Sequence, residues 1–433
     1  MSVGLGRQRP LIAIIGATGT GKSQLAVSLA HKYNGEIING DALQLYEGLP
    51  VTTNKLPLSE RKSIPHHLIG CIPLNESPWT VRQFHDRATQ AVSNIRARGK
   101  LPILVGGTQY YIQSLLLSHS LVEEQLCKNS AFESQPNGWP KPNTSTEDML
   151  QELRRLDPLI AQRWHPNDRR KIQRSLEICL RAGVPASTIY SSQSSIDVED
   201  EEGRRDGEPS VHQSRDVLIL WTHARSDMLN PRLDQRVDDM LALGLCDEAQ
   251  SLYDRITEYE QQGIAIDQSQ GICIAIGYKE LLPLLRDATH SPSTKDEAIF
   301  RIKTATKQYA KRQTRWIRLK LLAAIRAARL EQNLFLLDAS DILRWSSDVD
   351  QVAHDITRDF LKARELPDPR SLSALASEML ALQKRPERAA RRCDVCHKTL
   401  MSDVEWTGHV KSKAHQAAMR PKIDWRALYP KTK

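Results

Sequence analysis

Eight consecutive residues near the start of the chain have the composition of a phosphate-binding loop. They follow the pattern G-x-x-x-x-G-K-[ST] and comprise Gly16, Ala17, Thr18, Gly19, Thr20, Gly21, Lys22 and Ser23. Glycines let backbone N–H groups point toward a phosphate, the lysine can neutralise its charge, and the serine hydroxyl is suited to a Mg²⁺ ion. The motif predicts a polyphosphate site. It leaves open whether the protein is a kinase, a nucleotide hydrolase or an enzyme with another phosphorylated donor.

Two further polar residues lie just past predicted strands. Asp41 comes after the segment 36–39, and Thr108 comes shortly after the segment 101–105. In parallel α/β sheets, ligands gather at the carboxyl ends of the strands. A carboxylate at such a position can bind Mg²⁺ through water, accept a proton or cap the next helix, and a threonine can cap a helix or contact a ligand.

A zinc finger is predicted near the end of the chain. Its four ligands follow the spacing C-x2-C-x12-H-x5-H and are Cys393, Cys396, His409 and His415. Two thiolates and two imidazoles at such spacing bind Zn²⁺ tetrahedrally. The interval between the histidines resembles that of fingers that bind structured RNA, which they contact through phosphates and 2′-hydroxyls. A finger that contacts another protein is the alternative.

The positive charge of the chain lies mostly at this end. The 433 residues hold 60 Lys plus Arg against 52 Asp plus Glu, a net charge of +8. Residues 384–433 hold 13 and 5 of these, so the terminal segment carries the whole excess. A basic module on a neutral body favours a polyanionic partner, most often nucleic acid. The alternative is a segment that only keeps the protein soluble.

A second basic segment spans residues 301–329, with ten Lys plus Arg and no acid. Its apolar residues recur at helical spacing, and Lys303, Lys307, Lys311 and Arg315 follow one another at four-residue steps. The spacing predicts an amphipathic helix. Because like charges four residues apart repel in a helix, we interpret the stripe as a surface that faces phosphates.

The order of apolar segments predicts an α/β protein with a parallel sheet, like that of P-loop NTPases, an inserted helical domain and a terminal Cys2His2 finger. The strand candidates are 11–15, 36–39, 101–105 and 216–221, and the helix candidates are 24–31, 149–156, 168–182 and 229–245. The predicted domains are the core (1–124 and 216–365), the helical insertion (125–190), a flexible acidic loop (191–215), a linker (366–388), and the finger with its basic tail (389–433).

No segment of about 18 apolar residues occurs, so we expect no membrane-spanning helix. Seven cysteines with one close pair argue against a secreted disulfide framework. We therefore expect an intracellular protein in the cytoplasm, and take a monomer as the default because the sequence does not reveal the oligomeric state. The sequence leaves additional mitochondrial and nuclear locations open.

Taken together, these motifs resemble the tRNA dimethylallyltransferases, also called tRNA isopentenyltransferases, and the finger resembles the eukaryotic branch of that family. The similar segments lie in the family's order over roughly residues 10–330. They are 16–23, 41–46, 53–55, 66–68, 106–111, 168–177, 276–280 and 309–313 with Trp316.

The resemblance implies transfer of a dimethylallyl group from dimethylallyl diphosphate to N6 of the adenosine 3′ of the tRNA anticodon (position thirty-seven). It implies that Asp41 is the general base and that the loop 16–23, with Thr18 as a catalytic residue, holds the diphosphate. An arginine also grips this group, and Arg236 is favoured over Arg232. Mg²⁺ and Zn²⁺ are the implied cofactors.

The implied contacts with the tRNA anticodon stem-loop come from four parts of the chain. The resemblance implies Asp41, Ala42, Leu43, Gln44, Thr108, Gln173, Arg174, Ser175, Leu176 and Glu177, and the basic segment adds Lys307, Lys311, Arg312 and Arg315 as expected contacts.

Three residues depart from the family pattern: Gly40 and Ala42 stand where serines are usual, and Gly70 stands where an aspartate is common. One alternative function is an adenylate isopentenyltransferase that acts on free nucleotide, and another is a non-catalytic RNA-binding protein. The finger and the basic helix favour tRNA over free nucleotide, and the intact Asp41 and phosphate loop favour an enzyme.

Overall fold

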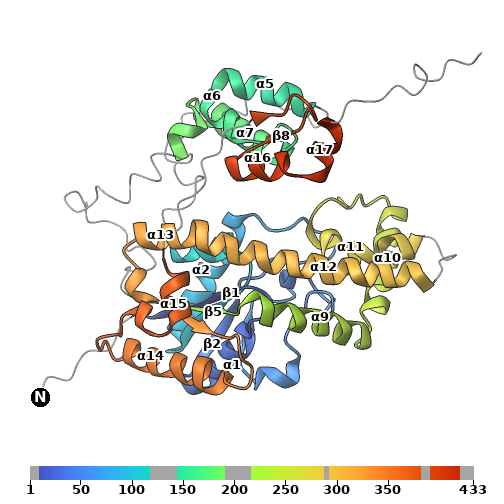
Figure 1. Ribbon diagram of the computed structural model, residues 1–433. Helices are drawn as coiled ribbons and strands as arrows, with labels where there is room; N and C mark the ends of the chain where they lie inside the picture. Colours follow the sequence, from blue (N-terminus) through green and yellow to red (C-terminus); the bar gives the residue numbers. More distant parts are fainter. Residues whose placement is uncertain (1–8, 118–143, 191–215, 287–291, 382–390, 420–433) are drawn as a thin grey trace, which may run out of the picture. The chain divides into compact units, whose positions relative to one another are not determined.

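The computed structural model describes residues 9–117, 144–190, 216–286, 292–381 and 391–419. It divides into two compact units (Figure 1). The first comprises Met1–Ser120 and Arg205–Gln383, and the second comprises Leu121–Arg204 and Lys384–Lys433. The predicted acidic loop 191–215 and the last residues of the basic tail, 420–433, lie outside the described residues.

Six parallel strands form the sheet of the first unit, in the order β3-β2-β4-β1-β5-β6. Their bounds are β1 Leu11–Gly16, β2 Gly35–Asn39, β3 His66–His67, β4 Leu101–Val105, β5 Val217–His223 and β6 Leu334–Asp338. Strands buried on both faces are continuously apolar. That pattern predicted β1, β2, β4 and β5, and the structure confirms all four.

Helices cover both faces of this sheet. Alternate residues of β1 point to opposite faces. Ala13 and Ile15 belong to a core with α2 (Val81–Ala97), α3 (Gln109–Leu116), α10 (Leu245–Gln261), α11 (Tyr278–Arg286) and α13 (Leu322–Ala327). Ile12 and Ile14 belong to a core with α1 (Lys22–Lys32) and α14 (Val352–Leu361).

Two long helices, α9 (Ser226–Ala242) and α12 (Pro292–Trp316), contribute to both cores and lie side by side (Figure 1). A π-helix, η5 (Ile317–Leu321), continues α12 into α13. The remaining short helices are η1 (Leu43–Leu45), η2 (Leu58–Arg61), η4 (Gly271–Ile274), η6 (Glu331–Asn333), η7 (Ser346–Gln351) and η8 (Pro369–Ser371). Among the described residues, no helix is long and apolar enough to cross a bilayer.

The first unit continues past residue 365, into the segment 366–388 that the sequence suggests is a linker. Helix α15 (Ala374–Met379) buries Leu375, Ala376 and Met379 in the core that contains α2. These residues are too few to show a helical period in the sequence, which is why the segment reads as a linker.

Three helices of the second unit are α5 (Thr146–Leu156), α6 (Pro158–Arg163) and α7 (Arg169–Ala182). The side chain of Asp168 accepts the N–H of Lys171, and Gly183 ends α7 with a φ of 66°. An aspartate before the first turn and a glycine after the last are common boundaries of a helix, and here they bound the predicted helix 168–182. The finger comprises β7 (Arg391–Arg392), β8 (Thr399–Leu400), α16 (Asp403–Val410) and α17 (Lys413–Met419).

Candidate active site

The loop between β1 and α1 has a backbone that requires glycine. Gly16 has a φ of 149°, and an added Cβ would lie 2.3 Å from the carbonyl oxygen of Thr222 on β5. Gly21 has a φ of 75°, and its Cβ would lie 2.1 Å from the ring of Trp345. Positive φ and close approach together exclude larger residues. The loop therefore turns directly over the end of the sheet, where the first N–H groups of α1 are available to an anion.

Lys22 lies at the first position of α1 and bends back over the loop. Its Nζ donates to the carbonyl of Ala17 at 2.6 Å. Loss of hydration lowers the pKa of Lys22 to about 8, with Arg236 contributing in the same direction and Asp41 opposing it. A cation with little hydration interacts strongly with a phosphate, because it gives up little water on binding.

Arg236 reaches the same loop from α9. Its guanidinium donates to the hydroxyl of Thr18 at 2.7 Å, and burial lowers its pKa. Arg232, one helical turn earlier, donates instead to the carbonyl of Ala339 at 2.7 Å and to that of Ser340. The sequence favoured Arg236 without excluding Arg232, and the structure places only Arg236 on the loop.

Gln313 of α12 connects the phosphate loop to the end of β4. Its Oε1 accepts the backbone N–H of Thr18 at 2.8 Å, and its Nε2 donates to the carbonyl of Gly107 at 3.0 Å. The side chain is buried, at 5% exposure. The sequence did not predict this residue as part of the site, although its spacing of three and four residues from the buried Ala310 and Ile317 places a polar side chain on their apolar helix face, where it is unusual.

Asp41 is held at the carboxyl end of β2. Its Oδ1 accepts the N–H of Leu43 at 3.1 Å, and the side chain of Asn39 bonds its backbone N–H and carbonyl, each at 3.0 Å. Its Oδ2 faces Gly107, where an added Cβ would lie 3.3 Å away. Asn39 is a second residue that the sequence did not predict. The bond to Leu43 orders the backbone just before η1, but the N-cap of η1 is Ala42 and no side chain caps it, so the structure does not show the capping role that was the alternative for Asp41.

Removal of water raises the pKa of Asp41, and the bond to Leu43 and the charge of Lys22 oppose that rise. Burial and the charge of Asp41 also raise the pKa of Tyr111, to about 12, and that of Tyr309 on α12. Both phenols therefore stay protonated in neutral solution. Asp41 is the group among these three that can accept a proton there.

Thr108 ties the ends of two strands together. Its hydroxyl accepts the N–H of Ala42 at 3.0 Å, and its N–H donates to the carbonyl of Gly40 at 3.2 Å. It does not cap α3 with its side chain. An added Cβ at Gly106 would lie 2.3 Å from the backbone of Gly40. These contacts fix the distance between Asp41 and the phosphate loop through the sheet.

Gln44 and Gly70 shape the loop beside Asp41. Gln44 donates to the carbonyls of Thr53 and Asn54 at 3.2 and 3.0 Å. Gly70 has a φ of 61°, a conformation that glycine adopts without strain. At this third departure from the family pattern, the backbone itself favours the glycine. At Gly40 an added Cβ would meet Ile112 at an ordinary 3.4 Å, so the structure does not explain that departure.

The basic stripe of α12 is partly neutralised within the protein, which corrects the interpretation that all of it faces phosphates. Lys303 pairs with Asp238 at 2.7 Å, and Lys307 pairs with Asp234 at 2.9 Å. This part of the stripe faces α9, which supplies both acids. The sequence of α12 does not show that α9 packs beside it. Lys311, Arg312 and Arg315 are exposed. In the described parts of the chain, no acidic side chain lies within 4.0 Å of these three.

The predicted tRNA-contacting residues of α7 fall into two groups. Ser175 and Leu176 are buried, and Ser175 accepts a hydrogen bond from Trp164 at 2.9 Å. They support the fold of the second unit instead of offering a surface. Glu177 bonds Gln173 at 3.0 Å and pairs with Arg174 at 3.6 Å. These three polar side chains are at least partly exposed, and their contact with tRNA remains a prediction.

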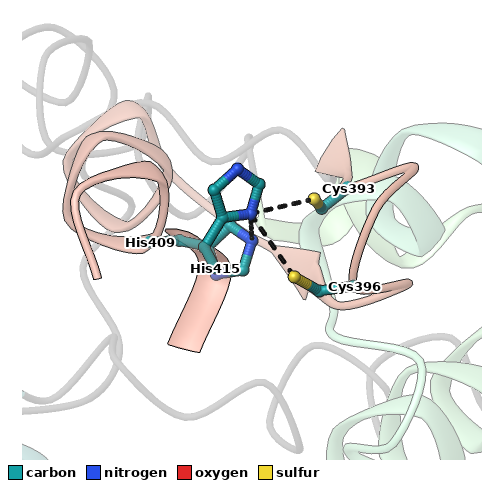
Figure 2. A group of neighbouring side chains, drawn as sticks. All are labelled: Cys393, Cys396, His409 and His415. Carbon is teal, nitrogen blue, oxygen red and sulfur yellow. Dashed lines mark hydrogen bonds between the residues drawn. The ribbon is translucent and has the colours of Figure 1, made fainter. Parts of the chain in front are cut away.

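The four predicted zinc ligands lie together (Figure 2). Their ligand atoms all lie within 4.8 Å of one another. The Nδ1 of His415 is 3.6 Å from the sulfur of Cys393, 3.3 Å from that of Cys396 and 3.1 Å from the Nε2 of His409. Tetrahedral bonds of about 2.0–2.3 Å to one Zn²⁺ would separate the ligand atoms by roughly 3.3–3.8 Å. The set therefore fits zinc.

The site thus presents a loop of amide donors with a lysine and an arginine, and next to it a carboxylate with a raised pKa. This arrangement can hold an anionic leaving group while a neighbouring nucleophile loses a proton.

Comparisons with known proteins agree with this arrangement. The family model described as IPP transferase matches residues 44–320. A tRNA dimethylallyltransferase of Saccharomyces cerevisiae is 34% identical over 429 residues, which cover 96% of this chain and 93% of that protein. The Homo sapiens tRNA dimethylallyltransferase is 33% identical over 437 residues, covering 98% and 89%. A solved structure of a eukaryotic dimethylallyltransferase acting on tRNA has a TM-score of 0.72 and 32% identity, over 95% of this chain and 96% of that one.

Proposed function

The chain belongs to the IPP transferase family, and from that premise we propose that it is a tRNA dimethylallyltransferase. It transfers a dimethylallyl group from dimethylallyl diphosphate to N6 of the adenosine 3′ of the anticodon. The products are N6-isopentenyladenosine and diphosphate. An enzyme that acts on free nucleotide would need neither a finger nor the exposed cations Lys311, Arg312 and Arg315 that follow Lys307 on α12.

The leaving diphosphate lies in the phosphate loop in this proposal. Breakage of the allylic C–O bond places negative charge on the diphosphate, so donors that are already in position there lower the barrier. Lys22, the amide groups of the loop and the guanidinium of Arg236 are these donors. Mg²⁺ bound through the hydroxyl of Ser23 would neutralise further charge on the diphosphate when present.

Asp41 removes the proton from N6 as the new bond forms. An exocyclic amine is a poor nucleophile, and a positioned base contributes to its attack. The adenine must leave its stack to bring N6 to the carboxylate. The observation that carries the proposal is the chain of contacts from Arg236 through Thr18 and Gln313 to Gly107, because it holds the anion site and Asp41 in one framework.

A labelling assay tests the proposed function. Radiolabelled dimethylallyl diphosphate is incubated with the protein and either tRNA or adenosine monophosphate. We expect label in tRNA alone, at the adenosine 3′ of the anticodon. Label in the monophosphate alone would identify the free-nucleotide enzyme instead. Label in neither, with tRNA bound, would identify a binding protein.

The pH dependence of the transfer follows from the two shifted groups. Asp41 acts only when deprotonated, so kcat/KM for the donor falls as the pH drops through its raised pKa. Lys22 attracts the diphosphate only when its side chain is protonated and positively charged. Therefore kcat/KM also falls as the pH rises above about 8, the pKa of Lys22. We expect a bell-shaped profile between these limits.

A second lysine with a pKa lowered by burial provides a control for the alkaline limb. Burial also lowers the pKa of Lys55 to about 8, and that lysine donates to the carbonyls of Tyr46 and Gly48, away from the phosphate loop. Lys22→Arg should move the alkaline limb to higher pH, and Lys55→Arg should leave it in place. A limb that moves with Lys55 alone would contradict the assignment.

Deletion of the finger should weaken tRNA binding in a salt-dependent way. A chain that ends at Arg385 retains α15 and the described core but loses the zinc ligands and Lys411 and Lys413. Each lost phosphate contact makes the negative slope of log K against log salt shallower by about 0.7–0.9. We expect the slope to become shallower by the equivalent of at least about two contacts, measured by filter binding from low to moderate salt. An unchanged affinity and slope would contradict an RNA-binding role for the finger.

A single substitution tests the metal separately. Cys396→Ser removes one of four ligands, so the purified protein should contain well under one zinc per chain by elemental analysis, against one for the native chain. Cys71→Ser, at an exposed cysteine of the first unit, is the matched control and should leave the zinc content unchanged. Equal zinc in both variants would contradict the assigned ligand set.

A further inference from the structure

Two aromatic rings and a lysine form a cluster on the first unit that the proposed chemistry does not use. The rings of Tyr110 on α3 and Trp316 at the end of α12 meet edge to face, with centroids 5.0 Å apart. The Nζ of Lys320 lies 5.2 and 5.7 Å from their centroids and donates to the hydroxyl of Tyr110 at 2.9 Å. We call these three residues the aromatic–lysine cluster.

Tyr110 keeps an open surface in spite of these contacts, because it is 53% exposed. An aromatic ring beside a cation is a usual combination for stacking a nucleobase next to its phosphate. Exposed tyrosines are common singly. Here the contact with Trp316 and the bond from Lys320 hold the ring in one orientation.

The cluster lies on the same elements as the reaction site. Tyr110 is two residues after Thr108, whose hydroxyl accepts the N–H next to Asp41. Trp316 is three residues after Gln313, which bonds the phosphate loop and Gly107. The exposed Arg312 and Arg315 lie on the helix turn that leads to Trp316.

The helix changes its hydrogen-bonding pattern at this point. The π-helix η5 begins directly after Trp316 and contains Lys320. A π turn has one more residue than an α turn, so it rotates the side chains that follow it, and such turns recur at functional sites. Lys320 lies four residues after Trp316, a spacing at which helical side chains are neighbours, so the two residues share one face of the helix. The irregular turn contains the residue that contacts both rings.

We propose that the aromatic–lysine cluster binds an unpaired nucleobase of the anticodon loop other than the adenine that reacts, by stacking on Tyr110 with its phosphate next to Lys320. This inference rests on the proposed tRNA substrate and names a contact that holds the loop open. Stacking of that base on Tyr110 would offset part of the stacking energy that the loop loses when the reacting adenine leaves it.

The test uses anticodon stem-loop RNAs that carry 2-aminopurine, whose fluorescence is quenched by stacking, at each loop position in turn. With the full-length protein, we expect quenching at one position other than the reacting adenosine. Tyr110→Ala should restore the fluorescence there and weaken binding about tenfold, whereas Tyr110→Phe, which keeps the ring, should stay within about twofold of the native chain.

Phe300→Ala provides the matched control, because Phe300 is an exposed ring (68%) on the same helix α12. It should bind and quench like the native chain. If Tyr110→Ala quenches and binds like the native chain, the stacking proposal is wrong, whether or not the labelling assay shows transfer to tRNA. If transfer to tRNA fails while the quenching depends on Tyr110, the proposed function is wrong and the RNA contact stands.

Discussion

Replacing Asp41 by asparagine is expected to lower the turnover of the enzyme by about 10²–10⁴ while tRNA binding changes only a few-fold. Asparagine has nearly the same shape and can still accept the N–H of Leu43, so the start of η1 should persist. It cannot accept the proton of N6. The measurement is single-turnover transfer of label to tRNA, with affinity determined separately by filter binding.

Asp338 offers a control with the same local structure. It ends β6 as Asp41 follows β2, and its Oδ1 accepts the N–H of Ser340, two residues later, at 2.9 Å. Asp338→Asn should change the turnover by less than tenfold. Equal losses of affinity and turnover in Asp41→Asn would show that this carboxylate binds the substrate instead of removing a proton.

Removing the guanidinium of Arg236 is expected to lower kcat by about 10²–10³, the cost of losing one fixed donor to developing negative charge. Arg236→Ala also leaves the hydroxyl of Thr18 without its donor. Arg236→Lys keeps the charge but loses the planar fork, so it should recover only part of the rate. Affinity for inorganic diphosphate, measured by calorimetry, should fall in the same order.

Arg232→Ala separates this effect from a general loss of an arginine on α9. Arg232 bonds the carbonyls of Ala339 and Ser340, so its removal should lower the melting temperature and leave the diphosphate affinity within a few-fold. The opposite result, with diphosphate affinity lost in Arg232→Ala and retained in Arg236→Ala, would reverse the assignment of the two arginines.

Continuous apolar segments made most of the sheet predictable from the sequence. The strands β1, β2, β4 and β5 are buried on both faces and differ sharply from their surroundings. The two edge strands were not predicted. β3 is two histidines long and half-buried, and β6 follows a helix whose own apolar residues obscure where the strand begins.

The residues of the site also differ in how far the sequence predicts them. The phosphate loop and Asp41 could be predicted because a local motif or a strand end identifies each of them. Gln313 and Asn39 could not, because their roles depend on residues far away in the sequence or on backbone atoms that no residue type reveals. The pairing of Lys307 with Asp234 was missed for the same reason: a helix sequence does not specify which helix packs beside it.

The order of the strands has a consequence for how the protein forms during synthesis. The central strand β1 pairs with β4 on one side, but its other partner β5 leaves the ribosome only after the whole helical insertion, as the pairing of Leu11 with Val217 requires. Until then β1 has no partner strand on that side, and its backbone N–H and C=O groups there are unpaired. Contacts between such distant segments fold slowly and expose strand edges to aggregation. Chaperone protection of this half-built sheet should matter more for the yield of this enzyme than for proteins with local contacts.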